Sequence, residues 1–178
     1  MNDDEISVEA ARRFALEAHG DQRYGAFPYE KHLFDVWSIL HARGYTTRLQ
    51  QAAWLHDVEE DTQTSRFVLQ GRFGRDVEDL VWAVTGTGAN RAERVASAYQ
   101  KIATCPGAAT LKLADRIANV EACLQTVYDR TSDASARRRS EGLHRMYSSE
   151  HIGFKKALWP HCDDVLLWHR LELALGVR

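Results

Sequence analysis

Five residues that can bind a metal or move a proton lie together in the stretch from residue 55 to residue 62. His56 and Asp57 are adjacent there, and the carboxylates of Glu59, Glu60 and Asp61 follow. An adjacent His-Asp pair offers a divalent cation one imidazole nitrogen and one carboxylate oxygen, the mixed set that suits Mn, Fe, Co, Ni or Zn. A catalytic metal needs further protein ligands and one open position for water. The stretch therefore predicts half of a catalytic metal site, which distant histidines and aspartates must complete.

His32 and Asp115 are the candidates for the other half of such a site. His32 falls beside the apolar stripe of a predicted helix over 28–44. A lone histidine on a helix is more often a packing or surface residue than a ligand, so His32 depends on its context. Lys112, Asp115 and Asn119 are spaced i, i+3 and i+7 and project from one side of a predicted helix. We expect Asp115 to bind a metal while Lys112 and Asn119 reach the same ligand.

Amphipathic helices are the elements that must position these residues. Apolar residues recur at helical spacing, and no strand-like alternation persists long enough to require a sheet. His56 follows Leu49 at i+7 and so falls on a buried helix face, with Asp57 at the end of that helix. A buried carboxylate without a partner is costly, so a metal or an arginine is expected beside it. The sequence predicts an all-α bundle of about eight to nine helices, over residues 7–19, 28–44, 47–57, 65–71, 77–84, 90–102, 108–128 and two more within 135–175.

Residues that favour helix starts set these boundaries. Ser7, Ser65 and Asn90 stand where an N-cap is needed, Thr47-Arg48-Leu49-Gln50 reads as a capping box, and Pro28 suits a first helical turn. In the C-terminal region we interpret the histidines as packing or surface residues, because no carboxylate pattern accompanies them; they are His144, His151, His161 and His169.

Size and composition bound the class of protein. The 178 residues are 44% apolar with a net charge of −2, which fits one globular domain over 1–178. Three cysteines at long spacings argue against a disulfide framework and favour the cytoplasm. No apolar run approaches a membrane span, and near-neutral charge disfavours a nucleic-acid binder. The cluster Arg137-Arg138-Arg139 is interpreted as a solvated helix face.

Two groups of basic residues outside that cluster are candidates for binding an anionic substrate. Arg91, Arg94 and Lys101 make the predicted helix over 90–102 basic, which is usually only a solvated surface. An enzyme that acts on polyanions, however, needs cations near its metal. In the predicted loop over 20–28, Arg23 and Tyr24 offer a cation and a ring, and a guanidinium can stack on a base.

Several motifs in order resemble one family. They read HGDQR at 19–23, PYEKH at 28–32, AWLHDVEEDT at 53–62 and LKLADRIAN at 111–119. The order H…HD…D resembles the HD-domain metal-dependent phosphohydrolases, and the wider match is similar to the RelA/SpoT-type hydrolase domain and its stand-alone small form, the MESH1-like alarmone hydrolases. The resemblance covers about residues 7–125, with the helices of 135–175 expected to complete the bundle.

The resemblance implies an activity and a set of roles. The family is all-helical and removes the 3′-pyrophosphate from ppGpp and pppGpp to leave GDP or GTP, usually with Mn²⁺, while some members act on NADPH. By resemblance, Glu60 and Asp61 would orient and deprotonate the attacking water, Arg23 would stack on guanine, and Asn119 would lie near the ribose or a phosphate. The metal ligands implied are His32, His56, Asp57 and Asp115. The other candidates for binding substrate are Tyr24, Lys112, Arg91 and Arg94.

This sequence departs from the family pattern on the side that would meet the base and ribose. Tyr24 stands where a lysine is often found, Leu33 where a proline is common, and Glu121-Ala122 where a basic residue and a threonine occur. The alternatives are therefore a phosphatase or nucleotidase acting on another nucleotide such as NADPH, and a metal module that binds a nucleotide without turning it over. No nucleotidyltransferase half follows, so no synthetase activity is expected. The sequence leaves the choice of monomer or dimer open.

Overall fold

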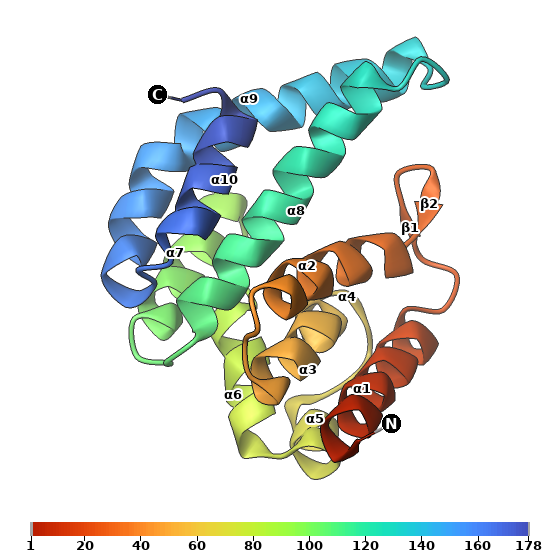
Figure 1. Ribbon diagram of the computed structural model, residues 1–178, viewed down its shortest axis with the longest axis vertical. Coiled ribbons are helices and arrows are strands. Elements are labelled where there is room, and N and C mark those ends of the chain that lie inside the picture. The colour runs from red at the N-terminus through yellow and green to blue at the C-terminus, as the bar shows by residue number, and fades with distance from the viewer. Residues whose placement is uncertain (1, 178) are drawn as a thin grey trace.

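Helices supply nearly all the regular structure in the computed structural model, which describes residues 2–177 (Figure 1). Nine helices of eight or more residues and one single turn, α4, are found within these residues, and the predicted all-α class is confirmed. The bounds are α1 Asp3–His19, α2 Glu30–Ala42, α3 Thr47–Leu55, α4 Val58–Asp61, α5 Arg66–Phe73, α6 Arg75–Val84, α7 Arg91–Ile102, α8 Ala108–Tyr128, α9 Ala134–Leu158 and α10 Val165–Leu175. A 3-10 turn, η1, spans Trp159–His161.

The predicted loop over 20–28 contains a small hairpin. Strands β1, Arg23–Tyr24, and β2, Phe27–Pro28, pair antiparallel with Tyr24 opposite Phe27. Two-residue strands carry too little alternation to be seen in a sequence. Pro28 therefore lies in the hairpin, and the prediction that it opens the following helix is wrong, because α2 begins at Glu30.

Side-chain capping explains where other helix starts differ from the predicted ones. α1 begins at Asp3, four residues before the predicted start, because Asn2 and Glu5 form a capping box: the Asn2 side chain accepts a hydrogen bond from the Glu5 amide at 2.8 Å. The predicted capping box at Thr47 is absent, since the Thr47 hydroxyl instead donates to Asp4 Oδ1 at 2.8 Å. Asn90 caps α7 through the Glu93 amide, as predicted.

The long helix α8 lies at the centre of the bundle. It packs against α2 and α6 on one side and against α9 and α10 on the other, so most of its residues are buried (Figure 1). The largest fully buried side chains are Trp54, Trp168 and Phe154. Leu143 of α9 is 45% exposed. Polar residues on the buried faces of α8 are thus brought against several other helices, which suits a site built from distant residues.

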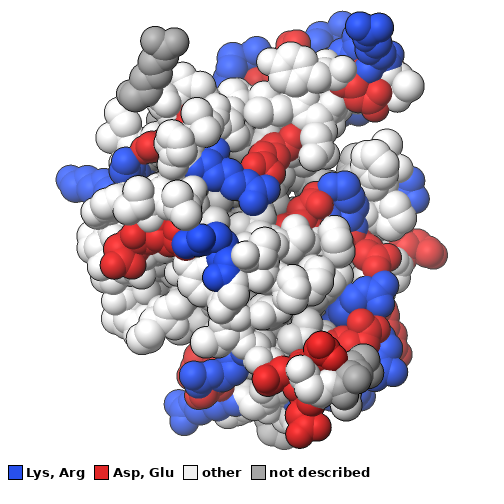
Figure 2. All heavy atoms as spheres, in the orientation of Figure 1, with Lys and Arg blue, Asp and Glu red and all other residues white. Residues whose placement is uncertain are grey.

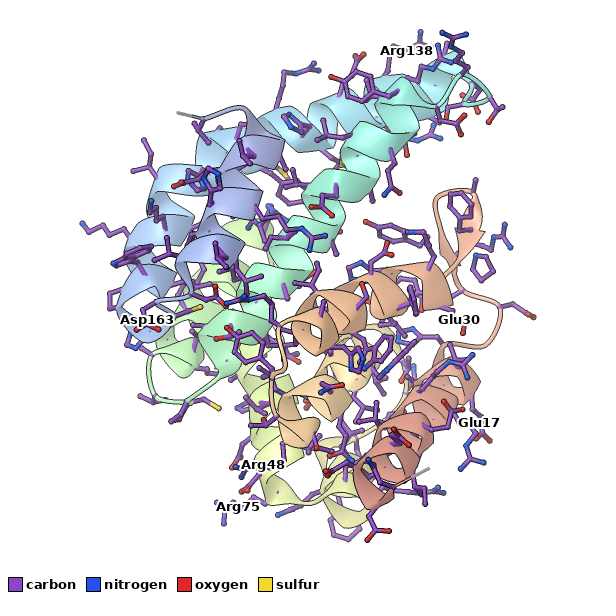
Figure 3. All side chains as sticks on the ribbon, in the orientation of Figure 1. Glu17, Glu30, Arg48, Arg75, Arg138 and Asp163 are labelled. Carbon is purple, nitrogen blue, oxygen red and sulfur yellow. The ribbon has the colours of Figure 1, made fainter. Side chains whose placement is uncertain are left out.

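Positive and negative side chains are interspersed over the face shown in Figure 2. The triple-arginine cluster lies at the tip where α8 and α9 meet, near Arg138 in Figure 3. Arg138 and Arg139 are exposed, while Arg137 donates to the backbone carbonyls of Asp129 and Arg130. Arg138 and Arg139 match the predicted solvated helix face, whereas Arg137 packs against the loop that precedes α9. Among the helices of residues 2–177, none is both long and apolar enough to cross a membrane.

Candidate metal centre and its pocket

Three helices bring four predicted metal ligands to one place. His32 projects from the first turn of α2, His56 ends α3, Asp57 links α3 to α4, and Asp115 comes from the middle of α8. The Nε2 atoms of His32 and His56 lie 3.2 Å apart. Asp57 Oδ2 lies 3.3 Å from His32 Nε2 and 3.1 Å from His56 Nε2. The ligand atoms of these three residues all lie within 4.8 Å of one another.

Asp115 approaches the same two nitrogens. Its Oδ1 lies 3.4 Å from His32 Nε2 and 3.8 Å from His56 Nε2. Both histidines are only 2% exposed, so their facing nitrogens are shielded from water. Two imidazoles and two carboxylates give a divalent cation a mixed N/O set that balances its charge, so the residues present fit a metal of that kind.

The hydrogen bond on the far side of His56 fixes how it faces the cluster. His56 Nδ1 lies 2.8 Å from the carbonyl oxygen of Ala53, which can only accept, so Nδ1 carries the hydrogen. In the neutral ring Nε2 is therefore a free lone pair aimed at the cluster, the arrangement found for most metal-binding histidines. Among the described residues His32 Nδ1 has no hydrogen-bond partner, and its ring is stacked on Tyr24 instead, with centroids 4.8 Å apart.

The electrostatics of the cluster favour a positive charge at its centre. Burial alone would lower the pKa of His56, but Asp57 and Asp115 outweigh it and raise that pKa to about 10. Burial would likewise raise the pKa of Asp57, yet the two histidines hold it well below its usual range. Lys112, whose Nζ lies 3.0 Å from Asp115 Oδ2, does the same for Asp115 together with the histidines. The same carboxylates would stabilise a cation placed between the histidines.

A second group of side chains holds the cluster from the side of α1 and the hairpin. The Tyr29 hydroxyl donates to Asp57 Oδ2 at 2.7 Å, and its ring stacks on buried His19 with centroids 4.5 Å apart. His19 Nδ1 lies 2.8 Å from Gln22 Oε1, and Gln22 Nε2 donates to Asp61 Oδ2 at 2.9 Å. Sequence reasoning assigned no role to His19, Gln22 or Tyr29. One signal was available: Tyr29 precedes His32 by three residues and so shares its side of the chain.

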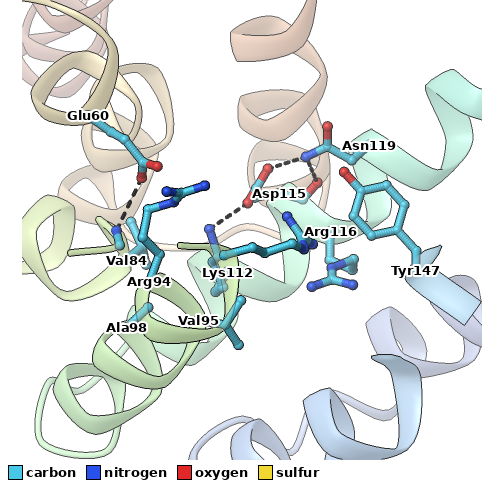
Figure 4. Close-up of a pocket in the computed structure, with 12 residues that line it drawn as sticks. Glu60, Val84, Arg94, Val95, Ala98, Lys112, Asp115, Arg116, Asn119 and Tyr147 are labelled. Atoms are coloured by element: carbon cyan, nitrogen blue, oxygen red, sulfur yellow. Dashed lines mark hydrogen bonds and ion pairs between the residues drawn. The ribbon is translucent and has the colours of Figure 1, made fainter. Parts of the chain in front are cut away.

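The carboxylates of α4 point in different directions. Glu60 is exposed and accepts a hydrogen bond from the Gly86 amide at 3.1 Å (Figure 4). Glu59 is turned inward instead: its side chain is 10% exposed and faces Arg66. Burial raises the pKa of Glu59, which is consistent with that environment. A single turn of helix thus sends Glu60 toward the pocket and Glu59 into the core.

The pocket beside Asp115 is formed by α7, α8 and the loop that follows α6, with α9 closing it (Figure 4). Four of the residues proposed from the sequence to bind substrate line it: Arg91, Arg94, Lys112 and Asn119. The remaining lining residues with polar groups are Glu60, Asp115, Arg116 and Tyr147.

Two predicted substrate-binding residues of the hairpin already have hydrogen-bond partners within the protein. The Arg23 guanidinium donates to the Ala26 carbonyl of its own turn, and Arg23 does not line the pocket. The Tyr24 hydroxyl donates to Asn119 Oδ1 at 2.9 Å. The structure therefore brings Tyr24 to the metal cluster and leaves Arg23 exposed beside it.

Helix α9 contributes residues that sequence reasoning treated as structural. Glu150 accepts two hydrogen bonds from the Arg91 guanidinium, at 2.8 and 3.0 Å, and one from Arg116 at 3.0 Å. Arg116 is 7% exposed and also lies over the ring of Tyr147, 4.6 Å from its centroid. The helices of 135–175 were expected to complete the bundle, and α9 in addition places Tyr147 in the lining of the pocket. No regular spacing links Glu150 to Arg91 or Arg116, so only the packing of α9 against α7 and α8 brings them together.

The buried His/Asp cluster on an all-α scaffold fits a divalent metal, and residues 11–144 match the sequence model described as "HD domain". The chain belongs to the HD-domain family of metal-dependent phosphohydrolases. Within that family it is 36% identical over 127 residues to guanosine-3′,5′-bis(diphosphate) 3′-pyrophosphohydrolase MESH1 of Xenopus tropicalis, covering 67% of this chain and 71% of MESH1. MESH1 of Homo sapiens is 34% identical over the same shares of the two chains.

Two further proteins extend the comparison. The guanosine-3′,5′-bis(diphosphate) 3′-pyrophosphohydrolase of Aquifex aeolicus is 36% identical over 120 residues, which cover 64% of this chain but only 17% of that longer protein. A solved structure described as a metazoan ortholog of SpoT that hydrolyses ppGpp superposes with a TM-score of 0.76 over 96% of this chain and 94% of its own. At 24% identity that likeness shows the fold.

Proposed function

We propose that this chain is a guanosine-3′,5′-bis(diphosphate) 3′-pyrophosphohydrolase that converts ppGpp or pppGpp and water to GDP or GTP and pyrophosphate. The observation that carries the proposal is the convergence of His32, His56, Asp57 and Asp115 from three helices beside a pocket rich in cations. The names of relatives that are 34–36% identical to it over 127 aligned residues support the substrate. The family requires a divalent metal, and we propose Mn²⁺, with Fe, Co, Ni or Zn as alternatives.

His32, His56, Asp57 and Asp115 would hold the metal. When bound, a divalent cation of this type polarises a phosphoryl oxygen and lowers the pKa of water. The protein's own contribution is to orient these ligands. The Ala53 carbonyl fixes the His56 tautomer, and the Tyr29 hydroxyl holds Asp57.

Glu60 and Asp61 would orient the attacking water and accept its proton. Both are exposed carboxylates on α4, one turn beyond Asp57. Glu60 is held by the Gly86 amide and Asp61 by Gln22, so each keeps an oxygen atom for water. A positioned carboxylate of this kind typically contributes on the order of 10²–10⁴-fold to rate.

The cations of α7 and α8 would bind the phosphates. Lys112 lies against Asp115, and Arg91 and Arg94 line the opposite wall of the same pocket. The charge that develops on the transferred phosphoryl group is spread over several oxygens, and fixed cations stabilise it there. Arg23, exposed at the hairpin, remains the proposed contact for the guanine base.

The proposal is tested with metal-reconstituted protein and a panel of ppGpp, pppGpp, NADPH, a deoxynucleoside triphosphate and a mononucleotide. We expect GDP and pyrophosphate from ppGpp, identified by ion-exchange chromatography. In water enriched in ¹⁸O, the label should enter pyrophosphate and not GDP, because attack at phosphorus breaks the bond between that phosphorus and the 3′ oxygen. An Asp57→Ala protein purified in parallel controls for contaminating phosphatases.

The panel also distinguishes the alternatives. Turnover of NADPH or another nucleotide with none of ppGpp would replace the proposed substrate while leaving the phosphohydrolase class intact. Binding of ppGpp without turnover, with the metal site filled, would indicate a nucleotide-binding module instead.

A further inference from the structure

Tyr24 reaches from the hairpin to two different helices of the metal cluster. Its ring stacks on His32 of α2, with centroids 4.8 Å apart and planes 21° apart. Its hydroxyl donates to Asn119 Oδ1 of α8 at 2.9 Å. Both partners are next to, or part of, the proposed metal ligands. A single side chain on a two-residue strand therefore spans the opening between α2 and α8.

The donors and the acceptor of the Asn119 amide show the role of its hydrogen bond with Tyr24. Asn119 Nδ2 donates to the backbone carbonyl of Asp115 at 3.0 Å and to Asp115 Oδ1 at 2.5 Å (Figure 4). A carbonyl and an ionised carboxylate only accept, so they fix the orientation of the amide and use both of its hydrogens. The amide oxygen then faces Tyr24, which must be the donor. Asn119 has no hydrogen left to offer a phosphate or ribose in this arrangement.

We propose that Tyr24 is a positioning residue for the metal site: through Asn119 it orients the carboxylate of Asp115, and through its ring it holds His32. The inference rests on the proposed function in taking Asp115 and His32 as metal ligands. It revises the sequence prediction for both Tyr24 and Asn119, which assigned them to the substrate. Asp115 is then fixed from two sides, by Asn119 on Oδ1 and by Lys112 on Oδ2.

The ordered partners beyond a metal's ligands set its affinity, so the test is metal binding. Loss of such a partner typically costs on the order of 10–100-fold in affinity, and one hydrogen bond further out costs less. We expect Tyr24→Phe, which keeps the ring and removes the hydroxyl, to weaken Mn²⁺ binding by about 3- to 10-fold. Tyr24→Leu, which also removes the stacking on His32, should weaken it further. Metal-free protein is titrated with Mn²⁺ while free Mn²⁺ is followed by electron paramagnetic resonance.

Tyr45→Phe is the matched control. The Tyr45 hydroxyl also donates to an acceptor on another helix, Asp164 Oδ2 at 2.6 Å, but at the start of α10. Its loss should lower thermal stability and leave Mn²⁺ affinity unchanged. The comparison separates a local effect on the metal site from a general loosening of the fold.

A double-mutant cycle tests the route through Asn119. If the hydroxyl acts through the amide, Tyr24→Phe should weaken Mn²⁺ binding in the wild-type background and have almost no effect when Asn119→Ala is already present. Equal and additive effects in the two backgrounds would overturn the proposed route. Wild-type Mn²⁺ affinity in Tyr24→Phe, with a higher KM for nucleotide, would make Tyr24 a substrate contact and overturn the proposal.

The outcomes also separate this inference from the proposed function. If wild-type protein binds Mn²⁺ but does not hydrolyse ppGpp, the proposed substrate fails while the titration of the Tyr24 variants still decides the positioning role. If wild-type protein binds no divalent metal, the ligand assignment and this inference fail together.

Discussion

The two sides of the candidate site are built differently. On the metal side, His32 and His56 are each 2% exposed, and neutral donors and acceptors such as Tyr29 and the Ala53 carbonyl hold the cluster. On the phosphate side, charged groups hold one another, and the Arg91 side chain is 47% exposed while paired to Glu150. Removing one member of a buried group leaves its partners without compensation, whereas exposed ion pairs can be lost at small cost. A single mutation on the metal side should therefore abolish metal binding and turnover. A single mutation on the phosphate side should only weaken substrate binding.

The largest effect should come from breaking the metal side. His56→Ala removes the nitrogen that lies within 4 Å of Asp57, Asp115 and His32. We expect metal content close to zero, measured by inductively coupled plasma mass spectrometry, and turnover reduced by more than about 10³-fold. His161→Ala, at an exposed histidine of η1, is the control and should keep both. A His56→Ala protein with full metal content would contradict the assignment.

Glu60→Gln should give the next largest effect and separate chemistry from metal binding. The glutamine can still accept the hydrogen bond from the Gly86 amide, so the geometry of α4 is retained. The amide cannot accept a proton from water, so kcat should fall by about 10²–10³-fold while metal content is unchanged. Measuring kcat together with metal content checks both parts. An active Glu60→Gln enzyme would remove the proposed role of this carboxylate.

Arg91→Ala should have a moderate effect, because the phosphate side is graded. One cation is lost from the pocket while Arg94, Lys112 and Arg116 remain. We expect KM for ppGpp to rise by about tenfold with a small change in kcat, and the dependence of KM on salt concentration to weaken. Arg138→Ala, at the exposed tip of α9, is the matched control and should leave KM unchanged. A large loss of kcat in Arg91→Ala would make Arg91 part of the chemistry.

The smallest effect should be on stability at acid pH. The hydrogen bond from Arg91 and the charge of Arg116 lower the pKa of Glu150 below its ordinary value, against the effect of burial. A carboxyl whose pKa is lowered by folding adds stability above its unfolded pKa and loses it as the pH falls through the folded pKa. Wild-type Tm should therefore fall between about pH 5 and pH 3 more steeply than that of Glu150→Gln. Parallel Tm profiles would show that Glu150 contributes no such linkage.

Local sequence patterns predicted a helix well where regular apolar spacing and a clear start signal agreed. α8 spans 108–128 as predicted, because its apolar spacing is regular and Pro106-Gly107 precedes it. The start of α1 was predicted too late because Asn2, outside the apolar pattern, provides the stronger cap. The hairpin was missed because strands of two residues contain no period.

The candidate site was predictable only in part. His56-Asp57 and Asp115 stand out because their types and helical positions limit what they can do. Glu150 does not, because its contacts with Arg91 and Arg116 join residues 59 and 34 positions apart in the chain. The role of Asn119 was also hidden, since only the hairpin's position shows that Tyr24 uses its oxygen.

The sequence by itself determined the helical class, the identity of the side chains that gather at the cluster and the family to which the chain belongs. Periodicity suffices for the helical class, because it depends on residue type and on neighbours within two helical turns, whereas the family follows from the resemblance of several motifs in order. The tertiary structure alone decided which charges pair across the pocket and which groups hold the ligands. Those contacts depend on how α2, α8 and α9 pack, and packing is set by the whole buried surface rather than by any local spacing.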